Sequence, residues 1–150
     1  MTFLDNKFGF NGELDYAFLM NEKNKVYLVN KEFGKIDFEN IRINSVGMYF
    51  AEFREPELRL SIEGSQLVGN GCDRNMIGLD KEQIYSWLRG QDIEINDIDG
   101  DNLINVKDGS YVLLFNLDDK KDLKEFLGCG KFKGGKVMNF VPKERRIKAS

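Results

Sequence analysis

The chain has 150 residues, of which 41% are hydrophobic and 31% are charged, and its formal net charge is −3. This length suits one domain over residues 1–150, and no apolar run approaches the roughly 18 residues that a membrane-spanning helix needs. There is no histidine, which excludes Ser-His and Cys-His catalytic pairs and removes the commonest general base and metal ligand. Because the N-terminus also lacks a signal-peptide pattern, we expect a soluble, cytoplasmic protein.

Residues 1–41 are predicted to form a hairpin and an N-terminal extension. Ala17–Met20 and Val26–Val29 are short apolar runs on either side of a polar, turn-rich connector, which is typical of a hairpin. Met1–Leu14 carries three phenylalanines separated by glycines. That extension is interpreted as an added strand, a packing arm or an ordered tail, and its sequence does not choose among the three.

The middle of the chain indicates a long strand followed by a short helix. Ile41–Phe53 is predicted to be one long strand or a bent pair, with a turn near Gly47 as the alternative and a bulge or close backbone approach at that glycine. Ser61 can cap a helix over Ile62–Val68 by accepting from the free N–H groups of its first turn. Gly64 weakens this helix, so something is expected to pack closely on it.

A second helix is predicted over Lys81–Leu88, with Asp80 before it and Gly90 as its C-terminal stop. Its apolar residues share one face, and Trp87 is expected in the core more than in a ligand platform. Tyr111–Phe115 is predicted to be a buried strand, and Lys120–Phe126 a short helical turn. The predicted fold class is therefore α+β, mainly β, a small mixed barrel with two or three short helices.

Four aspartates have the spacing of a calcium-binding loop, namely Asp97, Asp99, Asp101 and Asp108. The loop has Asn102 where the sharp turn requires glycine, and its last ligand is an aspartate where a bidentate glutamate is expected. The preceding residues also alternate like a strand. We therefore interpret this segment as a solvated acidic loop and predict no metal site.

Residues 120–150 concentrate positive charge on an otherwise acidic chain. They hold ten basic and three acidic side chains, whereas the first 119 residues hold 12 basic and 22 acidic ones. Such density is self-repulsive unless an anion relieves it, and phosphate backbones are the commonest such anion. A solubilising basic tail is the alternative. Apolar residues recur through the segment, which favours a folded element.

A hairpin is predicted within this basic segment. Lys131–Lys133 and Lys136–Val141 alternate in polarity around Gly134–Gly135, and two glycines accept the positive φ values of a type I′ turn. Pro142 cannot donate to a ladder, so the second strand should end or lie at an edge there.

Three segments in this order resemble the PUA-like RNA-binding domain that is appended to the Sun and nucleolar-protein family of RNA cytosine-5 methyltransferases. They are Leu58–Leu67, Glu82–Gly90 with Trp87, and Phe126–Ile147 with Asn139, Pro142 and Lys143. The resemblance covers about residues 42–147 and implies a PUA-like barrel that binds RNA. The chain departs from the family at Cys129, where many relatives carry tryptophan, and it contains no counterpart of the catalytic domain.

Neither cysteine has the context of a catalytic nucleophile. Cys72 lies between glycine and aspartate, and Cys129 lies between two glycines, whereas the family places its cysteines beside proline or threonine. Two isolated cysteines give no zinc pattern and are interpreted as reduced thiols, with a disulfide as the less favoured alternative. We therefore expect no catalytic activity, no cofactor and no metal.

The resulting hypothesis is a non-catalytic RNA-binding protein that acts in rRNA or tRNA modification or in ribosome biogenesis. In one version of this hypothesis, the protein works in trans with a separately encoded methyltransferase. A protein-interaction module that docks an acidic partner is the alternative, and an enzyme with an unrecognised site is the third.

The basic residues would hold phosphates, the glycines would admit the RNA backbone, and Asn139 would read a base edge or brace the loop. Arg59 and Arg89 are second contacts or surface ion-pair partners. The predicted RNA-binding residues are Arg59, Arg89, Gly128, Gly130, Lys131, Lys133, Gly134, Lys136, Asn139, Lys143, Arg145 and Arg146.

Overall fold

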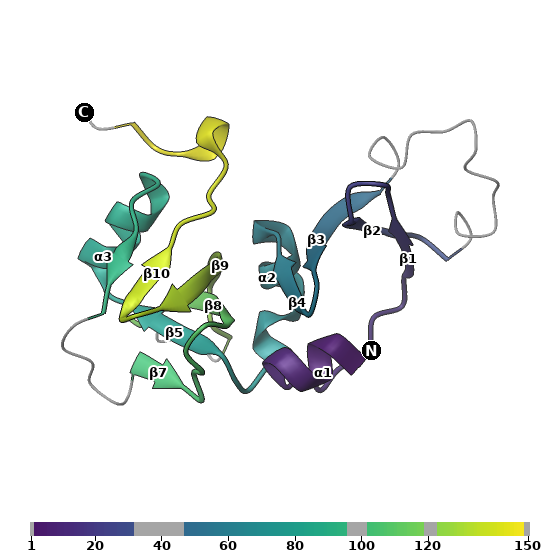
Figure 1. Ribbon diagram of the computed structural model, residues 1–150, viewed down its shortest axis with the longest axis horizontal. Coiled ribbons are helices and arrows are strands. Elements are labelled where there is room, and N and C mark those ends of the chain that lie inside the picture. Colours follow the sequence, from purple (N-terminus) through teal and green to yellow (C-terminus); the bar gives the residue numbers. More distant parts are fainter. Residues whose placement is uncertain (1, 32–46, 96–101, 119–122, 149–150) are drawn as a thin grey trace.

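The computed structural model describes residues 2–31, 47–95, 102–118 and 123–148. In these residues the strands form two sheets, and helices lie between and beside them (Figure 1). The α+β, mainly β prediction is confirmed at this level. Among the described residues, no helix is long and apolar enough to cross a membrane.

The first sheet is antiparallel and has the strand order β1-β2-β3-β4. The predicted hairpin is confirmed, because β1 and β2 pair antiparallel around a turn in which the side chain of Asn21 accepts hydrogen bonds from the backbone N–H groups of Lys23 and Lys25. The strands are β1 (Ala17–Met20), β2 (Lys25–Val29), β3 (Met48–Arg54) and β4 (Glu57–Leu60).

The second sheet has the order β6-β10-β9-β8-β5-β7, with β5 and β8 parallel and the other pairs antiparallel. In the part of the chain that is described, this sheet is open, with β6 at one edge and β7 at the other. Its strands are β5 (Met76–Leu79), β6 (Ile93–Glu94), β7 (Leu103–Ile104), β8 (Tyr111–Asn116), β9 (Phe126–Lys133) and β10 (Lys136–Met138).

Both predicted helices form with their predicted caps. In α2 (Ile62–Val68) the Ser61 side chain accepts from the N–H of Gly64, and in α3 (Lys81–Leu88) Asp80 and Gln83 form a capping box. Helix α2 contacts both β3 and β9 and so joins the two sheets. A Cβ on Gly64 would lie 2.2 Å from the carbonyl oxygen of Phe50, so the expected close packing on this glycine is confirmed. Two single 3₁₀ turns, η3 (Gly69–Gly71) and η5 (Lys143–Arg145), complete the described elements.

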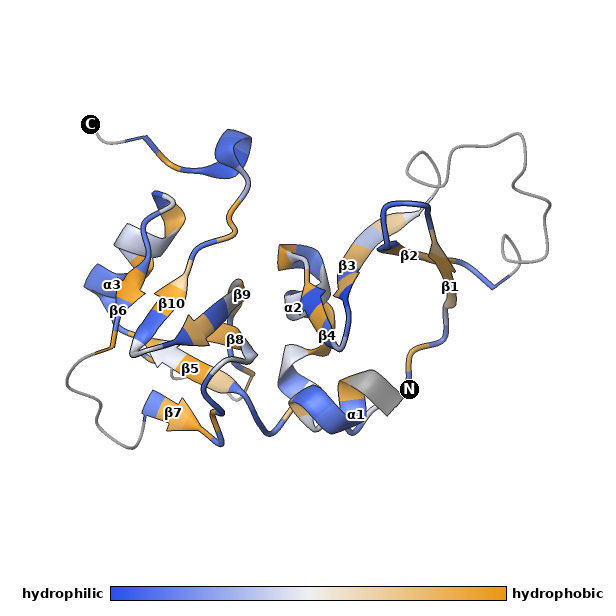
Figure 2. Cartoon of the chain, in the orientation of Figure 1, coloured by the Kyte–Doolittle hydropathy of each residue, from blue (hydrophilic) through white to orange (hydrophobic). Residues whose placement is uncertain are grey.

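The core consists of two clusters on opposite faces of the second sheet. Leu113 of β8 belongs to the cluster that faces the first sheet, whereas its neighbours Val112 and Leu114 belong to the cluster under α3. Trp87 is fully buried in that second cluster, which confirms its predicted core position. The hydropathy of the residues along each strand and helix can be followed in Figure 2.

The N-terminal extension is a packing arm, and the alternative of an added strand is wrong. Residues Thr2–Phe8 form helix α1, and Leu4 and Phe8 are buried against the first cluster. The same helix is tied to β4 by an ion pair of 3.2 Å between Lys7 and Glu57. A helix forms here because its apolar residues at a spacing of four meet one core face.

The helical turn predicted over Lys120–Phe126 is wrong in its described part. Residues 123–125 are irregular, and Phe126 begins β9 because its ring packs against that of Phe115, with the centroids 6.0 Å apart. The predicted strand from Ile41 is described only from residue 47, and β3 begins at Met48. A Cβ on Gly47 would lie 2.9 Å from Cγ1 of Val29, so the close approach predicted at this glycine is confirmed.

Candidate functional site

The basic hairpin forms around the predicted glycine turn, but its second strand ends at Met138, before the predicted end at Pro142, because Asn139 turns the chain toward α3. Lys136 pairs with Lys133 across the turn, and Gly134 and Gly135 adopt φ values of 60° and 76°. A side-chain oxygen of Asp108 accepts from the N–H of Gly134 at 2.9 Å. Asp108 is therefore a turn-capping residue. Asp97, Asp99 and Asp101 of the acidic loop lie outside the described residues, and the described part holds no cluster of potential metal ligands.

The predicted basic residues do not form one continuous face. Lys133 and Lys136 lie at the hairpin turn, whereas Lys143, Arg145 and Arg146 lie in and after η5, well apart from that turn in Figure 1. Lys136 also stands opposite Glu94 of β6. The expectation of a single basic surface at the C-terminus is wrong, because β10 carries the chain away from the turn before η5 begins.

The segment after β10 is anchored to the end of α3. The side-chain amide of Asn139 donates to the carbonyl oxygens of Trp87 and Gln91 at 2.9 and 2.8 Å, and its oxygen accepts from the N–H of Val141 at 2.7 Å. Because both amide protons are used, Asn139 braces the loop and does not read a base edge. Further along, the N–H of Ile147 donates to the carbonyl oxygen of Leu88.

Arg146 belongs to the same anchor. Its Nε donates to the carbonyl oxygen of Val141 at 3.0 Å, and its side chain lies so close to Gly90 that a Cβ there would fall 2.4 Å from Cδ of the arginine. A cation beside the C-terminus of α3 is favoured by the helix dipole. Arg146 therefore has a structural role.

The three predicted glycines have different environments. Gly134 is exposed, nothing lies within 4 Å of the position that a Cβ would take, and the residue serves the turn. Gly130 is buried, and a Cβ there would fall 2.9 Å from Cη2 of Trp87. The expectation that Gly130 admits an RNA backbone is wrong, because its space is taken by the indole. Gly128 is also buried, but it lines a cleft between the two sheets.

A strip of alternating cations and aromatic rings crosses from the second sheet to the first. Lys131 lies over the ring of Tyr111 at 5.3 Å, the rings of Tyr111 and Phe140 are 6.0 Å apart, and Arg59 lies over Phe140 at 4.5 Å. On the first sheet, Arg59 lies near Tyr49 and lowers the pKa of its hydroxyl against the effect of burial, and Lys25 lies over Tyr49 at 5.5 Å. We name this set the cation-aromatic strip; its members are Lys25, Tyr49, Arg59, Phe140, Tyr111 and Lys131.

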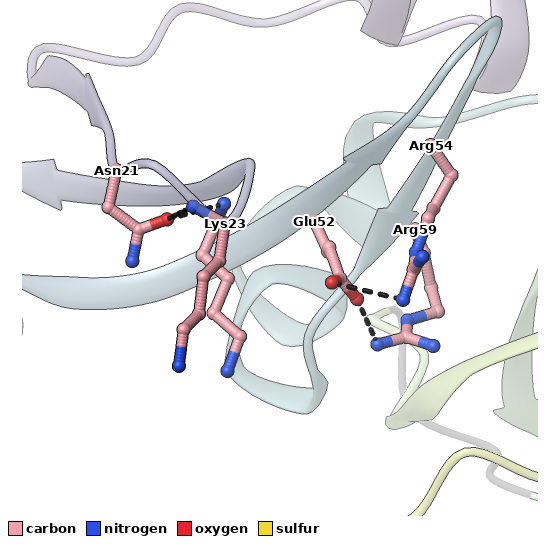
Figure 3. A network of polar contacts seen from close by, with 6 residues as sticks. Asn21, Lys23, Glu52, Arg54 and Arg59 are labelled. Atoms are coloured by element: carbon pink, nitrogen blue, oxygen red, sulfur yellow. Dashed lines mark hydrogen bonds and ion pairs between the residues drawn. The ribbon is translucent and has the colours of Figure 1, made fainter.

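A buried carboxylate fixes the arginine at the centre of the strip. Glu52 is 7% exposed, forms an ion pair of 3.1 Å with Arg54 and accepts a hydrogen bond from Arg59 at 2.5 Å (Figure 3). Glu52 and Arg59 face each other in the register of β3 and β4. The ion-pair interpretation of Arg59 is therefore confirmed. Because the guanidinium also covers Phe140, the pair positions a planar cation beside an aromatic ring.

The strip borders a cleft of about 100 Å³ between the two sheets. Tyr49, Arg59 and Phe140 belong to both, and the wall on the other side comes from α2, α3 and β9. The remaining lining residues are Leu60, Ser61, Ile62, Glu63, Trp87, Gly128, Cys129, Val141, Pro142 and Arg145. Arg145 forms an exposed ion pair of 2.5 Å with Glu63 at this cleft, and such a pair contributes little to stability.

The indole Nε1 of Trp87 is a buried donor with no hydrogen-bond partner among the described residues. An unsatisfied buried donor costs about 1–3 kcal/mol, so the position is uncommon in a stable core. A Cβ on Gly128 would lie 3.7 Å from this nitrogen. Gly128 and Trp87 both line the cleft.

Arg89 is not part of this arrangement. Its guanidinium lies over the ring of Tyr85 at 5.4 Å, at the C-terminal end of α3. It is not among the residues that line the cleft. Sequence reasoning assigned Arg59 and Arg89 the same two interpretations, as second contacts or surface ion-pair partners, and only the contact of Arg59 with Phe140 separates them.

The two cysteines are poor nucleophiles in this environment. Burial raises the pKa of Cys72 to about 12 and that of Cys129 to about 12. Both thiols are free and stay protonated at neutral pH. Burial also raises the pKa of Tyr49, partly offset by the nearby Arg59.

No protein-family model and no curated protein matches this chain. The PUA-like resemblance therefore stays a prediction.

Sequence reasoning missed Lys25, Tyr49, Tyr111 and Phe140 as site residues. The available signal was an aromatic residue near a basic one in β2, β3 and β9, but nothing local showed that these segments meet.

Proposed function

We propose that this chain is a non-catalytic RNA-binding protein whose interface is the cation-aromatic strip. The observation that supports it best is the path of Lys131, Tyr111, Phe140 and Arg59 from one sheet to the other. Single-stranded nucleic acids are held by cations that follow the phosphates and by rings on which bases stack. The strip supplies both kinds of contact: Lys25, Arg59 and Lys131 are the cations, and Tyr49 and Phe140 are the partly exposed rings. Tyr111 is 7% exposed and contacts Phe140 from the core.

The proposed RNA-binding surface differs from the one that the sequence predicted. Lys131 and Arg59 remain contacts, and Tyr49, Phe140 and Lys25 join them. Lys133 and Lys136 extend the strip toward the hairpin turn, where Asp108 and Glu94 dilute the positive charge. Arg145 lies at the cleft and is the contact proposed from the C-terminal segment.

The proposed cellular role is the one that the resemblance to the PUA-like domain implies. A PUA-like RNA-binding domain of the Sun and nucleolar-protein type would act in rRNA or tRNA modification or in ribosome biogenesis, together with a separately encoded methyltransferase. The non-catalytic part of the proposal is supported by the raised pKa values of both thiols, since the thiolate is the form that attacks a cytosine base.

Direct titration tests the proposal. Fluorescently labelled structured RNA and single-stranded oligouridine are titrated with the protein, with polyglutamate as the acidic competitor. We expect salt-sensitive RNA binding that polyglutamate displaces poorly, because a flexible acidic polymer offers no base to stack on Tyr49 or Phe140. Equal binding of polyglutamate would instead favour a protein-interaction module that docks an acidic partner.

Paired variants locate the interface. Lys25→Gln with Lys131→Gln removes the two terminal cations of the strip, while Lys81→Gln removes an exposed cation at the start of α3, on the opposite layer of the second sheet. We expect the double variant to bind RNA at least tenfold more weakly and the Lys81 variant to match the parent. RNA affinity that is unchanged in the folded double variant would place the interface elsewhere.

A further inference from the structure

We propose that the cleft beside the strip receives one pyrimidine base of the bound RNA and that Trp87 Nε1 donates a hydrogen bond to it. This inference rests on the RNA-binding function proposed above and adds a base-specific pocket to it. Trp87 is a core residue that also lines the cleft, and its Nε1 has no hydrogen-bond partner among the described residues.

The donor is held in a fixed position. On one side of the indole, Gly130 is so close that a Cβ would fall 2.9 Å from Cη2. Near the nitrogen, the backbone of Gly128 lies close: a Cβ there would sit 3.7 Å from Nε1 and 3.5 Å from Cγ1 of Ile62, and the nitrogen itself is buried. The carbonyl oxygen of Trp87 accepts a hydrogen bond from the side-chain amide of Asn139, which also helps to hold the tryptophan in place.

The cleft suits a flat ring that carries an acceptor. Apolar side chains of Ile62, Phe140 and Val141 line it, and Trp87 Nε1 is a donor without acceptor capacity. A carbonyl oxygen of uracil or cytosine would satisfy this donor. A group without an acceptor would leave the donor unpaired.

The size and the charge at the mouth favour a pyrimidine on a phosphate chain. The cleft has a volume of about 100 Å³. Sites that enclose a whole small molecule have volumes of about 300 Å³ or more. One ring can enter while the ribose and phosphate stay outside. Arg145 stands at the cleft in an exposed ion pair with Glu63 that a phosphate can displace.

The single tryptophan of the chain makes this pocket observable. In isotope-labelled full-length protein, heteronuclear NMR shows one indole N–H signal. On adding uridine monophosphate, we expect that signal to move downfield, to exchange more slowly with water and to show a proton contact with the pyrimidine ring. Ribose phosphate, which lacks the base, should leave it unchanged.

Oligonucleotides separate this inference from the function on which it rests. Oligouridine should bind more tightly than oligoadenosine or an abasic oligomer of equal length, and only oligouridine should move the indole signal. Binding of all three with equal affinity and an unmoved indole signal would overturn the base pocket while the RNA-binding function stands. An absence of binding to any oligomer would overturn the RNA-binding function itself.

Two variants give an independent readout. Phe140→Leu keeps an apolar side chain but loses the stacking surface, so we expect roughly tenfold weaker oligouridine binding. Met138→Leu, at an exposed position of β10, is the matched control and should bind as the parent does. A folded Phe140 variant with unchanged affinity and an unchanged indole shift would remove Phe140 from the pocket and contradict the proposal.

Discussion

Gly130 on β9 and the indole of Trp87 on α3 share one space, in which a Cβ on the glycine would fall 2.9 Å from the ring and 2.8 Å from the carbonyl oxygen of Met138. The buried indole and the β10 backbone cannot move away cheaply. Helix α3 can therefore pack on the second sheet only while position 130 has no side chain.

Gly130→Ala is expected to lower the free energy of unfolding by about 1–3 kcal/mol, because overpacking forces buried groups apart. Gly134→Ala is the matched comparison, since Gly134 has a φ of 60° and open space around it. It should lose only about 1–2 kcal/mol, from backbone strain. Urea denaturation measures both. Equal stability of Gly130→Ala and the parent would contradict the packing described here.

The ion pair between Arg59 and Glu52 predicts a strongly non-additive mutant cycle. Arg59→Met leaves a carboxylate that is 7% exposed, in an ion pair with Arg54 and opposite Lys25 in the register of β2 and β3, and we expect a loss near the low end of the about 3–5 kcal/mol that breaking a buried pair costs. Removing both charges with Glu52→Met should restore much of that loss. Chemical denaturation of the four proteins gives the coupling energy. Additive losses would show that the two charges act independently.

Single neutralisations should separate phosphate contacts from structural cations. Lys131→Gln should reduce the steepness of log affinity against log salt by roughly 0.7 for single-stranded RNA, the value for one phosphate contact. Arg89→Gln should leave that slope unchanged, because Arg89 packs on Tyr85 away from the strip. Fluorescence anisotropy over a range of salt concentrations measures both. A reduced slope for Arg89→Gln would extend the interface to the end of α3.

Cys129 predicts a loss of stability at alkaline pH. Burial raises its pKa from the ordinary 9.0 to about 12, so the unfolded state loses this proton first. The contribution is fully present below about pH 9 and is lost as the pH rises toward 12, by up to about 1.4 kcal/mol per pH unit. Cys129→Ala should flatten this dependence. Denaturation across that pH range measures the two slopes, and identical slopes would indicate that the thiol does not titrate differently on folding.

The locally coded elements could be predicted from the sequence alone. Paired glycines accept the positive φ values of the hairpin turn, Ser61 and Asp80 satisfy the free N–H groups of the helices that follow them, and Asn21 closes the first turn through its own side chain. Each of these depends on a few neighbouring residues. The apolar residues that recur among the C-terminal charges also indicated correctly that this segment is folded into the domain.

The candidate site depended on the tertiary structure. Sequence spacing grouped Lys133 and Lys136 with Arg145 and Arg146, but β10 separates these two pairs and turns Arg146 onto the end of α3. Conversely, the strip joins residues from five strands and from the segment after β10, and the unpaired donor of Trp87 is known only from the packed core. Such contacts follow from the packing of one sheet against another. Local periodicity records which face of a strand is buried, but it carries no information about which distant face covers it.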